Sequence, residues 1–296
     1  MIIAGLGGLA APLFVTVGGW VTVQSKWTLR KALIRFTFLY VAQILVNLSA
    51  PQRFDTFSPG VLTLFALLYL TAPLWVRISK NIQATMFLGV GIFTLNHLLL
   101  SGHESLDWDD RTFVGGLFEH VKHLFLTGTY PLLPWILFSL FGASLNNFNP
   151  SRRTLLVLGS GGCSISAYFL YRSIQEKIPF AQPSGEAMLT FFPANTAFLI
   201  AALTGVLLIW AMLENLDSKI GIHHLGRLSL TLYVIHFIPL SVFSDMDLNL
   251  YSASIITLAY TLLWWPLSVM HQARVPKYSL ENALRSMTEQ RKEKGA

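Results

Sequence analysis

The amino-acid sequence predicts an all-α fold, a polytopic integral membrane helix bundle with about nine transmembrane helices. Nine stretches of 17 residues or more contain no Asp, Glu, Lys or Arg. Hydrophobic residues make up 53% of the chain and charged residues only 12%, whereas soluble domains contain about 25% charged residues. The stretches also lack the period-two alternation that is typical of strands in outer-membrane barrels.

The nine charge-free stretches follow one another along the chain with short gaps. Each is long enough, or nearly so, to cross about 30 Å of hydrocarbon as a helix, and a helix satisfies its own backbone hydrogen bonds in lipid. In chain order the stretches are 1–25, 36–52, 56–76, 81–103, 123–151, 154–171, 187–213, 228–244 and 248–273.

Small residues in two stretches favour close packing of helices. The segment GLGGLAAPLFVTVGGW (5–20) and the GSGG at 159–162 are rich in glycine, which lets helix backbones approach closely in membranes. Pro12 is compatible with a membrane helix, because neighbouring helices can satisfy the carbonyl that a proline frees.

Two further segments are expected at the membrane surfaces. In 112–126, Phe113, Leu117, Val121 and Leu124 would share one helical face, which predicts an interfacial helix on the outer surface. Residues 1–273 are taken as the membrane domain, and 274–296 as an amphipathic, charged cytoplasmic tail. Ser279 and Asn282 have the spacing of a helix-capping pair at the start of a helix in this tail.

The distribution of charge predicts the orientation. If all nine stretches span the membrane, the loops on one side contain 16 of the 21 Lys and Arg residues, and the loops on the other side contain ten of the 15 Asp and Glu residues. The positive-inside rule makes the basic side cytoplasmic. We therefore expect a cytoplasmic (plasma) membrane protein with its N-terminus outside and its C-terminus inside. Basic residues confined to short loops do not indicate nucleic-acid binding.

Two histidines within charge-free stretches are candidates for chemistry. His97, beside Asn96, lies near the outer end of the fourth stretch, and His236 lies inside the eighth. An ionisable side chain in a membrane helix is costly and indicates function, although a neutral imidazole bonded to a neighbouring helix is the alternative. Glu119, His120 and His123 are better explained as a solvated helix face than as ligands, and no metal is expected. The single cysteine excludes an intrachain disulfide.

Five segments together resemble one membrane acyltransferase family. GLAAPLFVTVGGW is similar to the family's A-P-x-F helix, TYPLLPWILFSLFGASL to its F-P-L-L-P-W signature, and FFPANTAFLIAALTG to its Y-P-x-S helix. LGRLSLTLYVIHFIPL is similar to the L-G-R…Y-x-x-H helix, and KYSLENALRSMT to the P-L-E-x-x-x-R-x-x-T tail. In this sequence they begin at residues 8, 129, 191, 225 and 277. The order is that of the heparan-α-glucosaminide N-acetyltransferase-like family, which is related to uncharacterised membrane proteins and polysaccharide O-acyltransferases.

The resemblance implies transfer of an acyl group, typically acetyl, from acetyl-CoA or another acyl-CoA to an amino or hydroxyl group of a sugar or other envelope molecule. It implies a catalytic role for His236, which matches the motif histidine, and His97 is the second catalytic candidate because of its position in the fourth stretch. The substrate-binding residues would be Arg227, Asn96, Tyr233, Pro131, Pro134 and Trp135. Arg152, Arg153 and Lys31 could hold the coenzyme A phosphates as charge-assisted pairs; the alternative is that they serve only as topology signals. Arg227 and His236, nine residues apart on one helix, would lie roughly 13 Å from each other along its axis.

The sequence departs from the family at its beginning. The family starts with a helix bearing R-x-x-x-D-x-x-R-G and a histidine in the next outer loop, and the present chain is expected to begin at the family's second helix. Two alternatives therefore stay open: a lipid or glycan transporter or flippase without covalent chemistry, and an inactive truncated relative. Membrane lipids and a carbohydrate acceptor are the expected partners, and the oligomeric state is open, a homo-oligomer included.

Overall fold

The computed structural model of the 296-residue chain describes residues 2–100, 107–213, 223–242 and 248–289. Within these ranges the regular structure is helical, apart from strands β1 (Ala181–Gln182) and β2 (Leu189–Thr190), which pair in parallel. The predicted all-α class is confirmed.

The chain forms two compact units, which are described separately. Unit 1 contains Met1–Tyr40 and Phe57–Asn215, and unit 2 contains Val41–Thr56 and Leu216–Ala296. The boundary falls inside helix α2 (Leu29–Ser49), so the first part of this helix belongs to unit 1 and the second part to unit 2.

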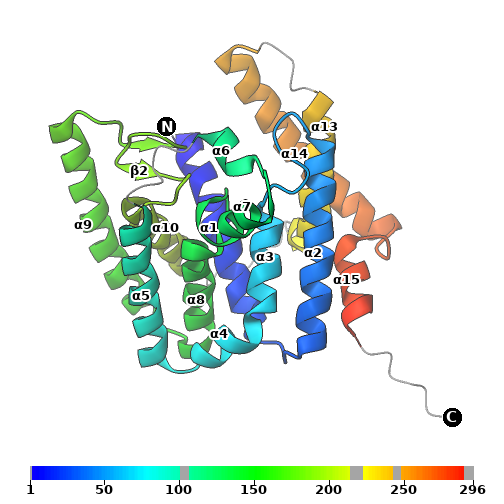
Figure 1. Ribbon diagram of the computed structural model, residues 1–296, viewed down its shortest axis with the longest axis horizontal. Coiled ribbons are helices and arrows are strands. Elements are labelled where there is room, and N and C mark those ends of the chain that lie inside the picture. The colour runs from blue at the N-terminus through cyan, green and yellow to red at the C-terminus, as the bar shows by residue number, and fades with distance from the viewer. Residues whose placement is uncertain (1, 101–106, 214–222, 243–247, 290–296) are drawn as a thin grey trace. The chain divides into compact units, whose positions relative to one another are not determined.

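Unit 1 is built around helix α8 (Leu132–Phe148), which packs against α1, α3 and α5 (Figure 1). Trp135 and Phe138 of α8 are fully buried. The other helices of the unit are α1 (Ile2–Thr22), α3 (Val61–Leu70), α4 (Ala72–Ile78), α5 (Ile82–Leu100), α6 (Trp108–Thr112), α7 (Leu117–Lys122), the π-helix η1 (His123–Thr127), α9 (Arg152–Glu176) and α10 (Thr196–Leu213).

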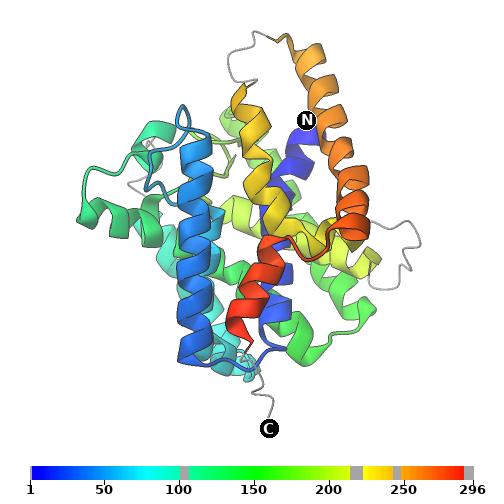
Figure 2. The same cartoon turned by 90° about the vertical axis from the view of Figure 1, so that its right-hand side faces the viewer.

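Unit 2 consists of short helices packed with one long helix. They are α11 (His223–Arg227), α12 (Ser229–Ile235), α13 (Phe237–Val242), α14 (Leu250–Arg274) and α15 (Leu280–Thr288). Helix α11 contacts α14, and α12 contacts α15; the chain can be followed from α11 to α15 in Figure 2.

All nine charge-free stretches contain apolar helix, but nine transmembrane spans are not confirmed. In the described residues five helices are long and apolar enough to cross a membrane, or seven if two bent helix pairs each count as one span. The segments Gly8–Thr22 and Ser229–Leu240 are apolar helices below that length. The five long helices are Leu29–Ser49, Ile82–Leu99, Arg152–Glu176, Thr196–Leu213 and Tyr251–Arg274.

Prolines and a glycine account for the two bent pairs. Helices α3 and α4 meet at 71°, at a break just before Pro73. The second pair, Leu117–Thr127 and Leu132–Phe148, meets at 42°, and Gly128 and Pro131 lie in the break. Proline has no N–H to donate and disfavours helical geometry in the residue before it, so a charge-free run alone overestimates the length of straight helix.

Glycines allow the backbones of α1 and α8 to touch. A Cβ atom at Gly142 would overlap the carbonyl oxygen of Thr16, and a Cβ atom at Gly19 would overlap the carbonyl oxygen of Ser139. In the GSGG segment, Gly162 of α9 leaves room for a side chain of α10, because a Cβ atom at Gly162 would overlap the Thr204 side chain. The prediction that these small residues serve helix packing is confirmed.

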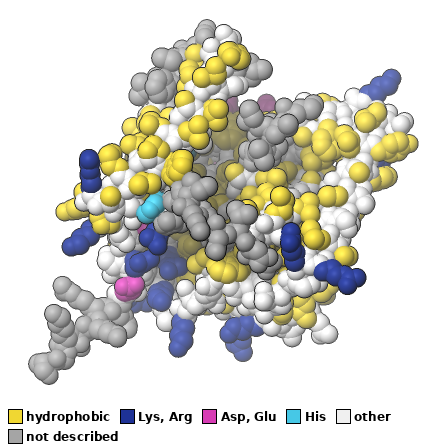
Figure 3. All heavy atoms as spheres, turned by 180° about the vertical axis from the view of Figure 1, so that it is seen from behind, with side chains coloured by type: hydrophobic (Ala, Val, Ile, Leu, Met, Phe, Trp, Pro, Cys, Tyr) yellow, Lys and Arg dark blue, Asp and Glu magenta, His cyan; other side chains and the backbone are white. Residues whose placement is uncertain are grey.

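Large apolar side chains cover the outer faces of the long helices. On α5 the exposed fraction is 84% for Phe87 and 65% for Val90. Hydrophobic side chains also occupy much of the described surface in Figure 3. Contiguous apolar surface of this kind is rare on soluble monomers and is the surface that lipid covers, so these are the helices of a membrane-embedded protein.

Loops that are distant in the sequence gather at two ends of unit 1. At one end, which we call the α4 end, the Asn147 side chain donates to the Ser79 carbonyl oxygen at 2.9 Å. At the opposite end, the α6 end, the Thr129 hydroxyl donates to the Pro59 carbonyl oxygen at 2.6 Å. Figure 1 shows α4 at one end of the unit, and α6 with the two strands at the other.

The α1–α8 contact predicts a large effect of one methyl group. Replacing Gly142 by Ala would force the two backbones apart, because a carbonyl oxygen cannot move aside as a flexible side chain can. We expect the variant to lose about 3 kcal/mol of stability, which thermal unfolding in detergent would measure as a lower melting temperature. Gly161 is the matched control, since a Cβ atom there meets nothing within 4 Å. Equal melting temperatures for Gly142→Ala and Gly161→Ala would contradict the prediction.

Candidate functional site

Five aromatic rings pack together near the start of α8. Trp135 is fully buried, and its ring centroid lies 4.9 Å from that of Tyr130 and 5.3 Å from that of Phe191. Phe192 and Phe198 contact Phe191 at 4.5 and 5.0 Å. This aromatic cluster joins two segments that are about 60 residues apart, the TYPLLPW and FFPANT motifs of the predicted family.

Pro131 and Pro134 shape the entry into α8. Pro131 is the N-cap of the helix, and Leu133, which precedes Pro134, has non-helical backbone angles of φ −98° and ψ 121°. Steric contact with a following proline ring disfavours helical angles, so the sequence explains this extended residue. Both prolines are buried, and their effect is to set the position of Tyr130 and Trp135.

The end of α5 is tied to the segment that precedes α10. The buried Asn96 side chain donates to the Ala194 carbonyl oxygen at 3.1 Å, and Nδ1 of the exposed His97 lies 3.3 Å from the Thr196 hydroxyl. Adjacent residues, predicted as a pair, thus have different surroundings. Asn96 holds the FFPANT segment in place, whereas His97 presents its imidazole at the surface of unit 1.

A buried arginine stabilises the α6 end. Arg111 is 1% exposed, and its guanidinium donates to the Thr127 carbonyl oxygen at 3.0 Å. Burial lowers the pKa of Arg111 to about 10, and the neighbouring Asp110 carboxylate opposes this shift. Arg111 therefore keeps its positive charge at neutral pH.

The histidines of the 112–126 segment bond to separate partners. Nε2 of His120 contacts the Tyr40 hydroxyl. Nδ1 of His123 lies 2.8 Å from the Thr127 hydroxyl, and its Nε2 lies 3.1 Å from the Phe113 carbonyl oxygen. A carbonyl oxygen only accepts, so Nε2 carries the proton and Nδ1 accepts from Thr127. Both ring nitrogens of His123 are occupied.

The predicted interfacial helix is shorter than expected. It begins at Leu117, after Phe113, and continues as the π-helix η1. Leu117 and Val121 are exposed, as an interfacial face requires, but Leu124 is 8% exposed and belongs to the core of unit 1. The single amphipathic face predicted for the segment is therefore only partly correct.

In unit 2, Arg227 and His236 do not lie on one helix, which corrects the expectation from the L-G-R…H motif. Arg227 ends α11, and Leu228 has non-helical angles of φ −114° and ψ 17° before α12 begins. Arg227 is exposed and His236 is half-buried. The axial separation expected for a continuous helix does not apply.

The imidazole of His236 has one nitrogen engaged by its own helix. Nδ1 lies 2.6 Å from the Tyr233 carbonyl oxygen and 3.1 Å from that of Leu232. Because carbonyl oxygens only accept, Nδ1 carries the proton and Nε2 carries the lone pair. Aromatic rings flank the imidazole, with centroids at 5.4 Å for Tyr233 and 4.2 Å for Phe237.

Two residues that sequence reasoning missed hold this part of unit 2. The Tyr260 hydroxyl donates to the backbone carbonyl of His236 at 2.6 Å. The Glu281 carboxylate accepts from the backbone N–H groups of Leu230 and Thr231 at 2.7 and 3.0 Å, and from the Thr231 hydroxyl. Glu281 therefore caps α12, whose N–H groups have no helical partner and favour a negative charge.

In the sequence, the capping pattern at the start of the tail was the one indication of the helix that carries Glu281. Ser279 accepts from the backbone N–H of Asn282 at 3.2 Å and begins α15, as predicted. The backbone N–H of Leu280 donates in turn to the Thr231 hydroxyl at 2.9 Å. Within the predicted tail 274–296, helix α15 thus contacts α12 in unit 2, while 290–296 lie outside the described residues.

The predicted coenzyme-binding residues are accessible cations. Arg152 and Arg153 lie exposed in the first turn of α9. Lys31 is half-buried, and its ammonium group donates to the Lys26 carbonyl oxygen at 3.4 Å. The ion pairs found in the described part of the chain do not involve these three residues. His97 belongs to unit 1 and His236 to unit 2, so each is described within its own unit.

Comparisons of the chain with protein-family models, with curated proteins and with solved structures find no match.

The contact of Glu281 with α12 predicts a specific loss of stability. Glu281→Ala would leave the N–H groups of Leu230 and Thr231 without their acceptor, at a cost of about 1–2 kcal/mol. Glu281→Gln, which keeps an acceptor oxygen but loses the charge, should have a smaller effect. Thermal unfolding and hydrogen exchange at the two amides would measure both changes. Glu289→Ala is the control, because Glu289 is exposed. Unchanged exchange in Glu281→Ala would refute the capping role.

Proposed function

We propose that the protein is an integral membrane acyltransferase, similar to the heparan-α-glucosaminide N-acetyltransferase-like family, that uses acetyl-CoA or another acyl-CoA. The acceptor is an amino or hydroxyl group of a sugar or another envelope molecule. The acceptor nitrogen or oxygen attacks the thioester carbonyl carbon, the new C–N or C–O bond forms and the C–S bond breaks. The acceptor proton passes to a histidine and then to the coenzyme A sulfur, which leaves as a thiol.

The tautomer of His236 is the observation that carries the proposal. Its Nδ1–H points at helix carbonyl oxygens, so Nε2 has a lone pair available to take the acceptor proton. A fixed tautomer and flanking rings are what a general base needs to hold its orientation. Tyr233 contacts the His236 imidazole with both its carbonyl oxygen and its ring, and we propose that it positions the substrate beside His236. We propose that Arg227 binds an anionic group of the substrate.

Within unit 1, the α6 end offers separate candidates for binding the acceptor. His97 is accessible and has the Thr196 hydroxyl as its neighbour, while the Asn96 amide fixes the backbone of the same segment. In the same unit the aromatic cluster with Trp135 is rigid, because its rings pack against one another. We assign His97 and Asn96 to the acceptor side, with Pro131, Pro134 and Trp135 shaping its wall.

The donor is proposed to approach from the α4 end. Helix α8 ends there, and α9 begins with Arg152 and Arg153 after a three-residue turn. Lys31 lies in the first turns of α2. Cationic side chains of this kind form charge-assisted pairs with phosphate oxygens. From the charge distribution we propose that the α4 end is cytoplasmic and the α6 end external, with the donor on the cytoplasmic side and the acceptor outside.

A transporter or flippase is the second candidate, and the two bent helix pairs favour it. The breaks of 71° and 42° interrupt helices that are otherwise apolar enough to span a membrane, and discontinuous helices form substrate sites in many transporters. Such a protein would move a lipid or glycan without consuming a thioester, so coenzyme A release separates the two candidates.

The acyltransferase proposal predicts that the purified protein releases coenzyme A when it is mixed with acetyl-CoA and an amino sugar. Chromatography would measure the coenzyme A released. His236→Ala should lower the rate at least about a hundredfold, because a positioned base contributes that much or more. His271→Ala is the control: this histidine lies near the end of α14, where Nε2 bonds to the Tyr278 carbonyl oxygen. Equal turnover of both variants would exclude His236 as the base. Substrate flux in vesicles without coenzyme A release would favour the transporter.

A further inference from the structure

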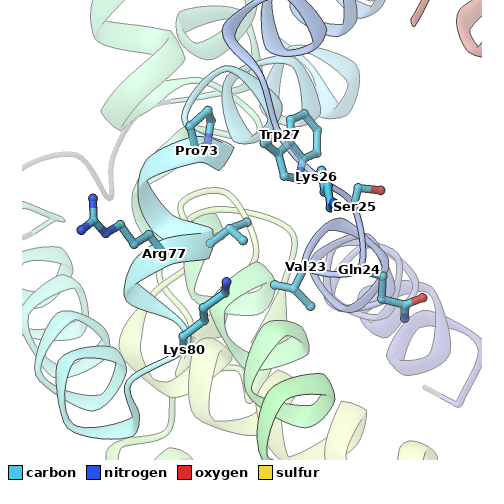
Figure 4. A pocket seen from close by; sticks show the side chains of 9 residues that line it. Val23, Gln24, Ser25, Lys26, Trp27, Pro73, Arg77 and Lys80 are labelled. Atoms are coloured by element: carbon cyan, nitrogen blue, oxygen red, sulfur yellow. The ribbon is translucent and has the colours of Figure 1, made fainter. Parts of the chain in front are cut away.

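A cavity of about 410 Å³ opens at the α4 end of unit 1, between the segment that follows α1 and helix α4. We call it the basic pocket. Figure 4 shows Lys26 on one side and Lys80 on the other, with the Lys80 ammonium directed into the space between the two segments and Arg77 at the outer edge of α4. Its lining includes Val23, Ser25, Lys26, Trp27, Arg77 and Lys80.

The charge of the basic pocket is uncompensated. Its lining contains three cationic side chains and no carboxylate, and the ion pairs of the described chain involve none of the three. Lys26, Arg77 and Lys80 are exposed. Like charges held around one cavity repel one another, and a bound anion relieves this repulsion.

The wall behind the pocket is rigid and also positive. Trp27 stacks on Tyr69 with 5.4 Å between ring centroids, and its indole N–H donates to the Thr22 carbonyl oxygen at 2.8 Å. The guanidinium of Arg35 lies 4.9 Å from the Trp27 ring and 5.1 Å from the Tyr69 ring. Cation–π contacts hold Arg35 there, so its charge adds to the positive field near the pocket.

The surroundings of the pocket are those of a membrane interface. Tryptophan is enriched at the boundary between hydrocarbon and water. Close in sequence to the lining residues Val23 and Pro73, α1 and α4 expose apolar side chains, with exposed fractions of 49% for Val21 and 66% for Leu74. A ligand with a phosphate in the pocket could therefore lay acyl chains along these helices.

We infer that the basic pocket binds the phosphate headgroup of an anionic phospholipid, with the acyl chains against α1 and α4. Basic pockets between membrane helices on the cytoplasmic side bind such headgroups. A soluble nucleotide phosphate, coenzyme A included, fits less well, because the Trp27 ring already stacks on Tyr69 and the lining offers no other aromatic ring for a base. This site is independent of the proposed acyl transfer.

The test compares lipids on the full chain purified in a neutral detergent. Dioctanoyl phosphatidylglycerol at about a hundred times its dissociation constant should raise the melting temperature by roughly 5 °C, and dioctanoyl phosphatidylcholine should not. The double substitution Lys26→Gln, Lys80→Gln should abolish most of the rise. The matched control Arg172→Gln, Lys177→Gln removes two exposed cations at the end of α9 and should retain it.

Three outcomes would overturn the lipid site. They are an equal rise with the zwitterionic lipid, an unchanged rise in the Lys26/Lys80 variant, and a rise with coenzyme A but not with phosphatidylglycerol. The last outcome would assign the pocket to a soluble phosphate. Because the measurement uses no acyl acceptor, its result does not depend on whether the protein catalyses acyl transfer.

Discussion

The backbone contact between α1 and α8 is the constraint on which the arrangement of unit 1 depends. Gly19 and Gly142 remove the side chains that would separate the two helices, so α8 lies at the centre of the unit. Each helix then leads to a functional surface: α8 begins at the aromatic cluster, and α1 ends at the basic pocket. Dispersion and close packing, rather than hydrophobic burial, hold helices together in lipid. Glycines, which have no side chain to separate the two backbones, therefore matter most at this contact.

Unit 2 depends on electrostatics at a helix end instead. Helix α12 follows a non-helical residue, Leu228, and its first N–H groups would be unsatisfied without the Glu281 carboxylate. Glu281 belongs to α15, so the segment nearest the C-terminus determines where α12 begins. The same short helix supplies the carbonyl oxygens that orient the His236 ring. The cap on α12 and the tautomer of the His236 ring therefore both depend on where α12 begins.

Sequence reasoning succeeded where a single local pattern decides the structure. Charge-free runs predicted the helices, and glycines predicted close approach, because both depend on the residue type alone. It failed at Thr71–Pro73 and at Leu228, where a run of apolar residues concealed a break. It could not find the partner of Glu281, because that contact joins residues 51 positions apart. Asn96 and His97 were predicted together as site residues. Only their contacts in the fold show that Asn96 is buried and bonded to the Ala194 carbonyl oxygen, whereas the His97 imidazole is accessible.

The basic residues near α2 show how topology and binding can be separated. A positive-inside signal requires only that cations lie in or beside the loop, and exposed Arg30 satisfies that requirement. Arg35 does not fit this explanation alone, because its guanidinium is held over two stacked rings. Lys26 and Lys80, contributed by segments that are about 50 residues apart, face one cavity without a carboxylate. Topology explains the sign of these charges, whereas their convergence on one cavity is explained by the anionic headgroup site that we propose.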